Sequence, residues 1–246
     1  MLEYNIIQQS TELFIYNNLF FRKNSWDENI FKSINITDEY GILGDNDLRS
    51  SWPGDIIDIG SHAGFFSYLQ YNSGKTNHIY AVEPDGENCC LFRLNLLDGL
   101  IKKQITLYER CLSYDTQLQC MPLRELDENT GGRPWIPYNG DTLRVMQKTS
   151  PVTHITLDEI IDQAKPPILL KIDCEGCEYD ILTKCKNLHK VEAFVGEHHS
   201  CDNYYIEILN NLNDFETHIT ETLECQGIFA GHKIKNSFFT SPDTEQ

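Results

Sequence analysis

The stretch ILLKIDCEGCEYDIL, residues 168–182, places three carboxylates and two cysteines between two aliphatic runs. The first run is typical of a buried β-strand and the second of a helix, so the polar residues follow the end of a strand. Asp173 is the most informative of them, because burying an unpaired carboxylate is costly. The rest of the chain has to show whether these groups do chemistry or only form a strand-to-helix turn.

The composition is that of an ordinary globular protein. The chain has 246 residues, of which 40% are hydrophobic and 23% charged, and this length can bury a sizeable core. No apolar run reaches the roughly 18 residues of a membrane span. The first residues lack the positive flank and apolar block of a signal peptide. We therefore expect a cytoplasmic location and no membrane span.

The net charge is −17, from 20 basic and 37 acidic residues. An anionic surface repels nucleic acid and anionic lipid. We therefore expect no nucleic-acid partner. The alternative interpretation is that the acidity serves only solubility.

Nine cysteines are scattered along the chain without the spacing of a disulfide framework. Cys174 and Cys177 form a C-x-x-C motif, which can serve redox chemistry or half of a zinc site. No second C-x-x-C exists. We interpret this pair as small packing residues.

Beyond residue 51, aliphatic segments alternate with helical patterns. Such alternation indicates a parallel sheet covered on both faces. A long polar stretch, 113–152, interrupts it, and residues 215–233 can supply a final antiparallel pair. The five expected parallel strands span 55–60, 78–84, 105–112, 167–173 and 191–198.

The turn-forming cluster SSWPGD, residues 51–56, predicts a boundary. We expect residues 1–50 to form a helical or irregular N-terminal extension and residues 51–246 to form the main domain. Within the extension, the apolar spacing of STELFIYNNLFF, residues 10–21, predicts an amphipathic helix.

Ligands of parallel sheets bind beyond the carboxyl ends of the strands. Gly60 follows the first strand, where it permits a tight turn close to a ligand. Glu83 ends the second strand, and a carboxylate there can accept hydrogen bonds from two ribose hydroxyls. The G-x-G-x-x-G pattern of dinucleotide enzymes is absent. These residues favour a nucleoside site, although a strand-end glutamate can also lack any role.

Four segments in this order resemble the FkbM-type S-adenosylmethionine-dependent methyltransferases: DIGSHAGFFS, AVEPDGENCCLFRLNL, ITLDEII and LLKIDCEGCEYDIL. The resemblance covers about residues 54–199. It implies an α/β fold of the Rossmann-like class I methyltransferase type, a seven-stranded mostly parallel sheet with helices on both faces. It also implies S-adenosyl-L-methionine as the cofactor and a final hairpin that inserts an antiparallel strand.

The resemblance also implies which residues contact the cofactor. The turn after the first strand would line its methionine end, with Ser61 and His62 standing where the family usually has Ala-Asn. Glu83 would bind the ribose, and the residues after the third strand would lie near the adenine. The expected contacts are Asp58, Gly60, Ser61, His62, Gly64, Glu83, Pro84, Asn88, Cys111, Leu112 and Asp173.

The reaction implied by the family is methyl transfer, and we expect O-methylation of a hydroxyl on a sugar, glycan or small metabolite. Such a hydroxyl must lose its proton, for which Asp173, His198 and Glu175 are the candidate catalytic residues. Oxygen ligands such as Asp173 and Glu197 could instead hold Mg²⁺. The alternatives are N-methylation of a small molecule or peptide, and a non-catalytic nucleoside-binding domain of the same fold.

The segment GGRPWIPYNG, residues 131–140, suits an acceptor with several hydroxyls. Arg133 could donate hydrogen bonds to it, and the rings of Trp135 and Tyr138 could stack on a sugar. We therefore expect an acceptor-side lid here, although an ordinary long loop is the alternative.

Overall fold

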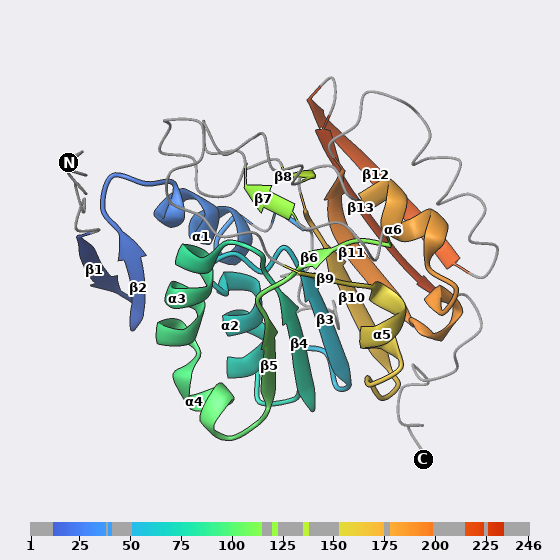
Figure 1. The fold of residues 1–246 in the computed structure, drawn as a ribbon, viewed down its shortest axis with the longest axis horizontal. Helices are drawn as coiled ribbons and strands as arrows, with labels where there is room; N and C mark the ends of the chain where they lie inside the picture. The colour runs from blue at the N-terminus through green and yellow to red at the C-terminus, as the bar shows by residue number, and fades with distance from the viewer. Residues whose placement is uncertain are drawn as a thin grey trace, which may run out of the picture.

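The structure is a computed structural model, which describes residues 12–37, 39–40, 51–114, 120–122, 135–137, 153–174, 178–198, 215–223 and 226–233. Its centre is a seven-stranded sheet of order β12-β13-β11-β10-β3-β4-β5 (Figure 1). Within it, β11, β10, β3, β4 and β5 are parallel to one another, and β13 runs antiparallel to β11 and β12. The strands are β3 (Asp55–Ile59), β4 (His78–Val82), β5 (Ile105–Tyr108), β10 (Ile168–Ile172), β11 (Ala193–His198), β12 (Phe215–Leu223) and β13 (Gln226–Lys233).

Helices cover both faces of this sheet (Figure 1). Successive strand residues point to opposite faces, so Ile56 packs in a cluster with residues of α1, α2 and α3, whereas Ile57 packs in a cluster with residues of α5 and α6. The fold predicted from the sequence is therefore confirmed, including the inserted antiparallel strand. The helices are α1 (Asp27–Asn35), α2 (Phe65–Asn72), α3 (Gly86–Asn95), α4 (Leu97–Ile101), α5 (Leu157–Ile161) and α6 (Glu178–Lys184), with a 3-10 turn η3 at Leu188–Lys190.

The predicted third strand, 105–112, is too long. β5 is the edge strand, and its last partner in β4 is Val82, which lies opposite Tyr108. Beyond that point the described chain leaves the main sheet and forms β6 (Cys111–Leu112), which pairs with β9 (His154–Ile155). A further short pair joins β7 (Cys120–Pro122) to β8 (Trp135–Pro137).

The helix predicted over residues 10–21 is wrong. The described part of this segment is a hairpin of β1 (Leu13–Tyr16) and β2 (Leu19–Arg22). Asn17 and Asn18 connect the strands with φ of 50° and 64°. Two successive residues with positive φ match the right-handed twist of a tight hairpin, and asparagine tolerates this conformation better than most residues.

The N-terminal segment packs into the same core as the sheet. Phe21 is fully buried and stacks on Phe65 of α2 with ring centroids 5.2 Å apart. Asn95 of α3 accepts a hydrogen bond from the backbone N–H of Phe20 at 2.7 Å and donates one to the carbonyl of Ala63 at 2.9 Å. These contacts fix the hairpin beside the loop that follows β3, while the domain boundary near residue 50 stays a prediction.

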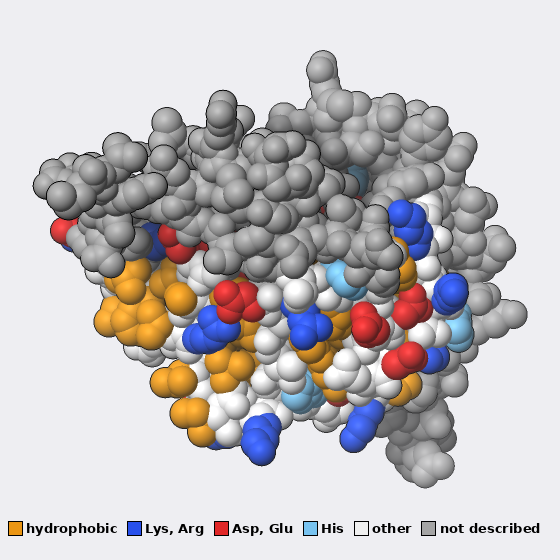
Figure 2. All heavy atoms as spheres, viewed as in Figure 1, with side chains coloured by type: hydrophobic (Ala, Val, Ile, Leu, Met, Phe, Trp, Pro, Cys, Tyr) orange, Lys and Arg blue, Asp and Glu red, His pale blue; other side chains and the backbone are white. Residues whose placement is uncertain are grey.

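Large hydrophobic side chains are exposed on one side of the molecule. Figure 2 shows them gathered where β1 and the α3–α4 region lie in Figure 1. They include Ile15, Leu97 and Ile101. Within the described part of the chain, no helix combines the length and apolar character needed to cross a membrane.

Candidate functional site

The loop after β3 lies across the end of β4. The backbone N–H groups of Gly60 and Ser61 both donate to the carbonyl of Val82 at 3.0 Å. Gly60 has a φ of +70°, and a Cβ atom there would lie 1.6 Å from the backbone oxygen of Asp173. Only glycine fits this position, which brings the loop directly against the end of β10. The ends of β3, β4 and β10 therefore meet at one edge, as predicted.

Gly64 has a different local role from the one that the resemblance implies. It precedes α2 with a φ of +84°, and a Cβ atom would lie 2.7 Å from Leu96 and 2.8 Å from Phe92. Close packing between α2 and α3 is thus enough to require glycine here. Its contact with a cofactor stays a prediction.

Three hydrogen bonds hold the side chain of Glu83 at the end of β4. Its side-chain oxygens accept hydrogen bonds from the backbone N–H of His62 at 2.9 Å, from that of Asp85 at 2.9 Å and from the Asn88 amide at 3.2 Å. The residue is 6% exposed. Burial raises the pKa of Glu83 to about 7, although these three hydrogen bonds oppose the shift. Its carboxyl group is fixed in orientation at the end of β4.

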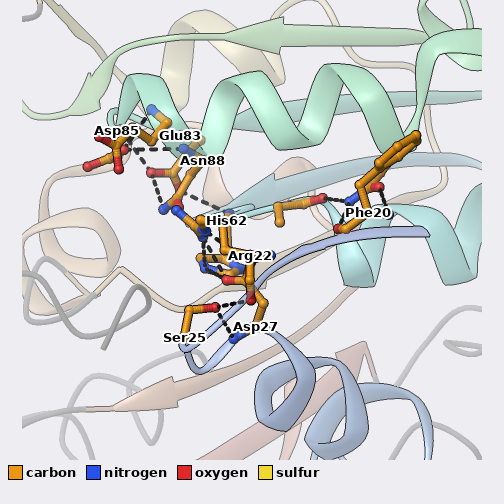
Figure 3. Close-up of polar contacts among 11 residues, drawn as sticks. Phe20, Arg22, Ser25, Asp27, His62, Glu83, Asp85 and Asn88 are labelled. Carbon is orange, nitrogen blue, oxygen red and sulfur yellow. Dashed lines mark hydrogen bonds and ion pairs between the residues drawn. The ribbon is translucent and has the colours of Figure 1, made fainter. Parts of the chain in front are cut away.

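A buried cluster connects Glu83 to the N-terminal hairpin (Figure 3). Arg22 forms a two-pronged ion pair with Asp27, with Nε–Oδ2 at 2.9 Å and Nη2–Oδ1 at 2.7 Å. The same Nη2 lies 2.8 Å from Asn88 Oδ1 and 3.2 Å from His62 Nε2. Burial lowers the pKa of His62 to about 3, so the ring is neutral and its Nε2 can accept the Arg22 hydrogen bond.

A second buried chain of polar groups runs from β3 to the end of β10. Lys171 lies beside Asp58 in the parallel register, and its Nζ is 3.4 Å from Asp58 Oδ1 and 3.8 Å from Asp173 Oδ2. Burial opposes the charge of Lys171, but the two carboxylates raise its pKa above the ordinary value. Ser67 donates to Asp58 Oδ2 at 2.6 Å, and the Tyr40 hydroxyl donates to Asp173 Oδ2 at 2.7 Å.

The two carboxylates at the ends of this series of polar groups differ in exposure. The side chain of Asp58 is fully buried, whereas that of Asp173 keeps 21% of its surface exposed. Asp58 therefore serves to hold Lys171 and α2 in place, and its predicted contact with a cofactor stays untested. Asp173 is the end that a bound molecule can reach.

The other predicted residues are distributed as follows. Asn88 is in the first turn of α3, which Asp85 caps by accepting the N–H groups of Glu87 and Asn88. Cys111 and Leu112 lie in β6, outside the main sheet. Glu178 at the start of α6 accepts the N–H of Cys174 at 3.0 Å, so its side chain reaches back toward the end of β10. The further predicted residues are Pro84, which follows β4, and Glu197 and His198, which end β11.

Some predictions fall outside the described residues. These are Glu175, Arg133, Tyr138 and the Cys177 half of the C-x-x-C motif. Among the residues that are described, no cluster of three or more His, Cys, Asp or Glu side chains could hold a metal ion.

Cys174 packs against the core cluster that contains Ile57, as predicted, and it is in addition disulfide-bonded. Four other cysteines of the described ranges are free: Cys89, Cys90, Cys111 and Cys185.

Reasoning from sequence missed Arg22, Asp27, Tyr40 and Lys171. Lys171 carried a signal, because a lysine inside the aliphatic run ILLKI must find a partner if that strand is buried. The other three carried none. They lie before residue 41, and only folding brings them to the strand ends.

The sheet order, the strand-end glutamate and the glycine turn together define a Rossmann-like methyltransferase fold. The sequence matches the Methyltransferase FkbM domain over residues 58–226. The chain therefore belongs to the FkbM methyltransferase domain family. Among curated proteins, none matches this sequence.

A solved structure of this family supports the fold. A crystal structure of methyltransferase FkbM from Methylobacillus flagellatus KT has a TM-score of 0.51 and 15% identity, over 82% of this chain and 48% of that one. The present chain thus spans about half the length of that protein. A rRNA methylase from Streptococcus thermophilus has a TM-score of 0.44 and 10% identity, over 75% of this chain and 89% of that one. Precorrin-6y C5,15-methyltransferase from Geobacter metallireducens GS-15 has a TM-score of 0.42 and 14% identity, over 76% and 83%.

Proposed function

We propose that this protein is an S-adenosylmethionine-dependent O-methyltransferase that acts on a hydroxyl of a sugar, glycan or small metabolite. The observation that carries the cofactor is Glu83. Three N–H donors hold its carboxyl group at the end of β4, and each carboxylate oxygen can accept more than one hydrogen bond. Two ribose hydroxyls are suitable further donors.

The residues around Glu83 fit the rest of such a cofactor. The Gly60 turn allows close approach of a bound molecule to the backbone. The Ser61 hydroxyl is buried beside it and makes no hydrogen bond within the described ranges. A buried polar group of this kind calls for a partner, which a ligand can provide.

When bound, S-adenosylmethionine supplies a methyl group that its sulfonium already activates. The protein then has to orient an acceptor hydroxyl and remove its proton. We assign this task to Asp173, because its carboxylate is the exposed end of the buried chain that includes Lys171. Tyr40 occupies Oδ2, so Oδ1 is the oxygen proposed to face the acceptor. His198 is the second candidate, and it is only 3% exposed.

The net charge of −17 supports a neutral acceptor over RNA, because phosphate-rich partners are repelled by an acidic surface. An acceptor hydroxyl could also be oriented by Mg²⁺ at Asp173 and Glu197, which is a separate proposal. Chelation by EDTA would abolish turnover if this ion is required and leave it unchanged if it is not.

The cofactor assignment is tested by calorimetry with S-adenosylhomocysteine. We expect the wild type to bind it and Glu83→Ala to bind at least about tenfold more weakly. Equal binding by both proteins would refute the role of Glu83, and no binding by the wild type would refute the cofactor.

The acceptor is tested by incubating glycan, metabolite and RNA pools with enzyme and methyl-labelled cofactor, followed by mass spectrometry. A methyl ether on a hydroxyl supports the proposal. A methylamine supports the N-methylation alternative, and label in RNA refutes a neutral acceptor.

A further inference from the structure

Residues far outside the matched domain reach the group that we propose binds ribose. Arg22 and Asp27 precede residue 58, where the match to the family begins. Arg22 ends β2, and Asp27 begins α1. Both are buried, and Figure 3 shows Arg22 between Asp27 on one side and His62 and Asn88 on the other.

Arg22 determines which way the Asn88 amide points. Its Nη2 donates to Asn88 Oδ1 at 2.8 Å, so the oxygen must face the guanidinium. The NH₂ group of Asn88 then faces Glu83 Oε1 at 3.2 Å. With the amide turned over, two donors would meet at Arg22 and two acceptors at Glu83. A single orientation therefore satisfies both neighbours.

Arg22 also holds His62, the other side chain beside Glu83. His62 has a φ of 50°, in the sparsely populated left-handed region. Its backbone N–H donates to Glu83 Oε2 at 2.9 Å. The His62 ring also lies against Arg22, with Nε2 3.2 Å from Nη2, so the guanidinium contacts two of the three residues whose N–H groups orient the glutamate.

Asp27 fixes the guanidinium in turn. Besides the two side-chain bonds, Asp27 Oδ2 accepts the backbone N–H of Arg22 at 2.8 Å. Burial opposes ionisation of Asp27, but Arg22 keeps its pKa below the ordinary value. A planar two-pronged pair of this kind has one geometry, which lysine cannot reproduce.

We infer that Arg22, oriented by Asp27, is a positioning residue that fixes Glu83 through Asn88 and His62 for binding the cofactor ribose. This inference rests on the proposed function. It makes the N-terminal hairpin and the start of α1 part of the cofactor site rather than an accessory segment.

The test compares binding of S-adenosylhomocysteine and its 2′-deoxy analogue by calorimetry. A positioned Glu83 distinguishes the two ligands, whereas a loosely held one does not. The test variant is Arg22→Met with Asp27→Leu, which removes both charges and leaves no buried carboxylate alone. The hairpin stays anchored by Phe21 in the core and by the Phe20–Asn95 hydrogen bond.

We expect the wild type to prefer the ribose ligand about tenfold, in line with the loss of one hydrogen bond to a charged group. The double variant should bind it about tenfold more weakly and show almost no preference. Arg93→Met is the matched control, because Arg93 pairs with Glu109 at the surface of the same helix as Asn88. It should keep both the affinity and the preference.

The inference is overturned if the double variant keeps the wild-type preference between the ligands. If that variant does not fold, Arg22→Lys replaces it, since lysine keeps the charge beside Asp27 but lacks the second nitrogen that reaches Asn88. An unchanged preference in Arg22→Lys likewise overturns the inference. Failure of the wild type to bind either ligand would instead refute the proposed cofactor.

Discussion

Glu83 and His62 should give this protein an unusual dependence of stability on pH. Burial raises the pKa of Glu83 to about 7, from an ordinary value of 4.5. A carboxyl whose pKa is higher in the folded state stabilises the fold below its ordinary pKa. That stability is lost as the pH rises through the folded value. The contribution of Glu83 to the free energy of unfolding should therefore decrease as the pH rises from acid to neutral.

The magnitude follows from the two pKa values. At pH ~5.5 an unfolded glutamate is already mostly ionised, while buried Glu83 still keeps its proton. Between about pH 5.5 and about pH 8, the Glu83 contribution to the free energy of unfolding should fall by about 2 kcal/mol. His62 acts in the opposite direction. Its pKa is lowered from 6.5 to about 3, so its contribution should rise by about 1.4 kcal/mol over the same range.

Urea unfolding of the wild type, Glu83→Gln and His62→Asn across this pH range separates the two contributions. The Glu83 carboxylate accepts hydrogen bonds from the backbone N–H groups of His62 and Asp85. Glutamine would place its own NH₂ group against one of these donors, which lowers the free energy of unfolding by the same amount at every pH because glutamine does not titrate. The free energy of unfolding of the wild type minus that of Glu83→Gln should therefore grow by about 2 kcal/mol from pH ~8 to pH ~5.5. His62→Asn keeps a residue that tolerates positive φ and removes the opposing contribution of the histidine to the free energy of unfolding.

A difference between wild type and Glu83→Gln that stays constant with pH would refute the raised pKa of Glu83. A difference that shrinks toward acid would show that the three hydrogen bonds, rather than burial, decide the charge of this group.

Three further predictions concern stability and are measured by urea unfolding. Gly60→Ala should lower the free energy of unfolding by at least about 3 kcal/mol, because its Cβ would overlap the backbone oxygen of Asp173. Gly74→Ala is the control: its φ of +69° is similar but the space around it is open, so it should cost only about 1 kcal/mol. Equal losses would contradict the packing argument. Lys171→Met should cost about 3–5 kcal/mol, since it leaves a buried carboxylate unpaired, and a loss no larger than that of the exposed Lys190→Met would show that the pair is unimportant. Asn18→Gly should preserve stability and Asn18→Val should lower it by about 1–2 kcal/mol, because valine disfavours a φ of 64°; tolerance of valine would argue against the hairpin turn.

The sequence by itself determined the sheet and its ligand-binding edge. Aliphatic runs separated by helical patterns specify strands and helices through local periodicity, and the right-handed crossover then leaves few arrangements. Glu83, Gly60 and Asp173 follow directly after strands, so a parallel sheet must bring them to one edge. The motif around Asp173 also indicates the family from sequence alone.

The apolar spacing of residues 10–21 predicts a helix wrongly, because a helix and a β-hairpin can both accommodate it. Leu13, Tyr16 and Phe20 have the i, i+3 and i+7 spacing of a helical face, yet the segment is a hairpin because Asn17 and Asn18 can both take positive φ. Packing of Phe21 against Phe65 then contributes burial that an isolated hairpin would lack.

Only the tertiary structure decided how the polar groups of the site are paired. Lys171 meets Asp58 because the register of β10 and β3 sets them side by side, and register is a property of the assembled sheet. Arg22 reaches Asn88 across 66 positions of sequence. Such a contact leaves no local pattern, because a buried guanidinium is stable only once its distant carboxylate and amide partners have been brought to it by folding.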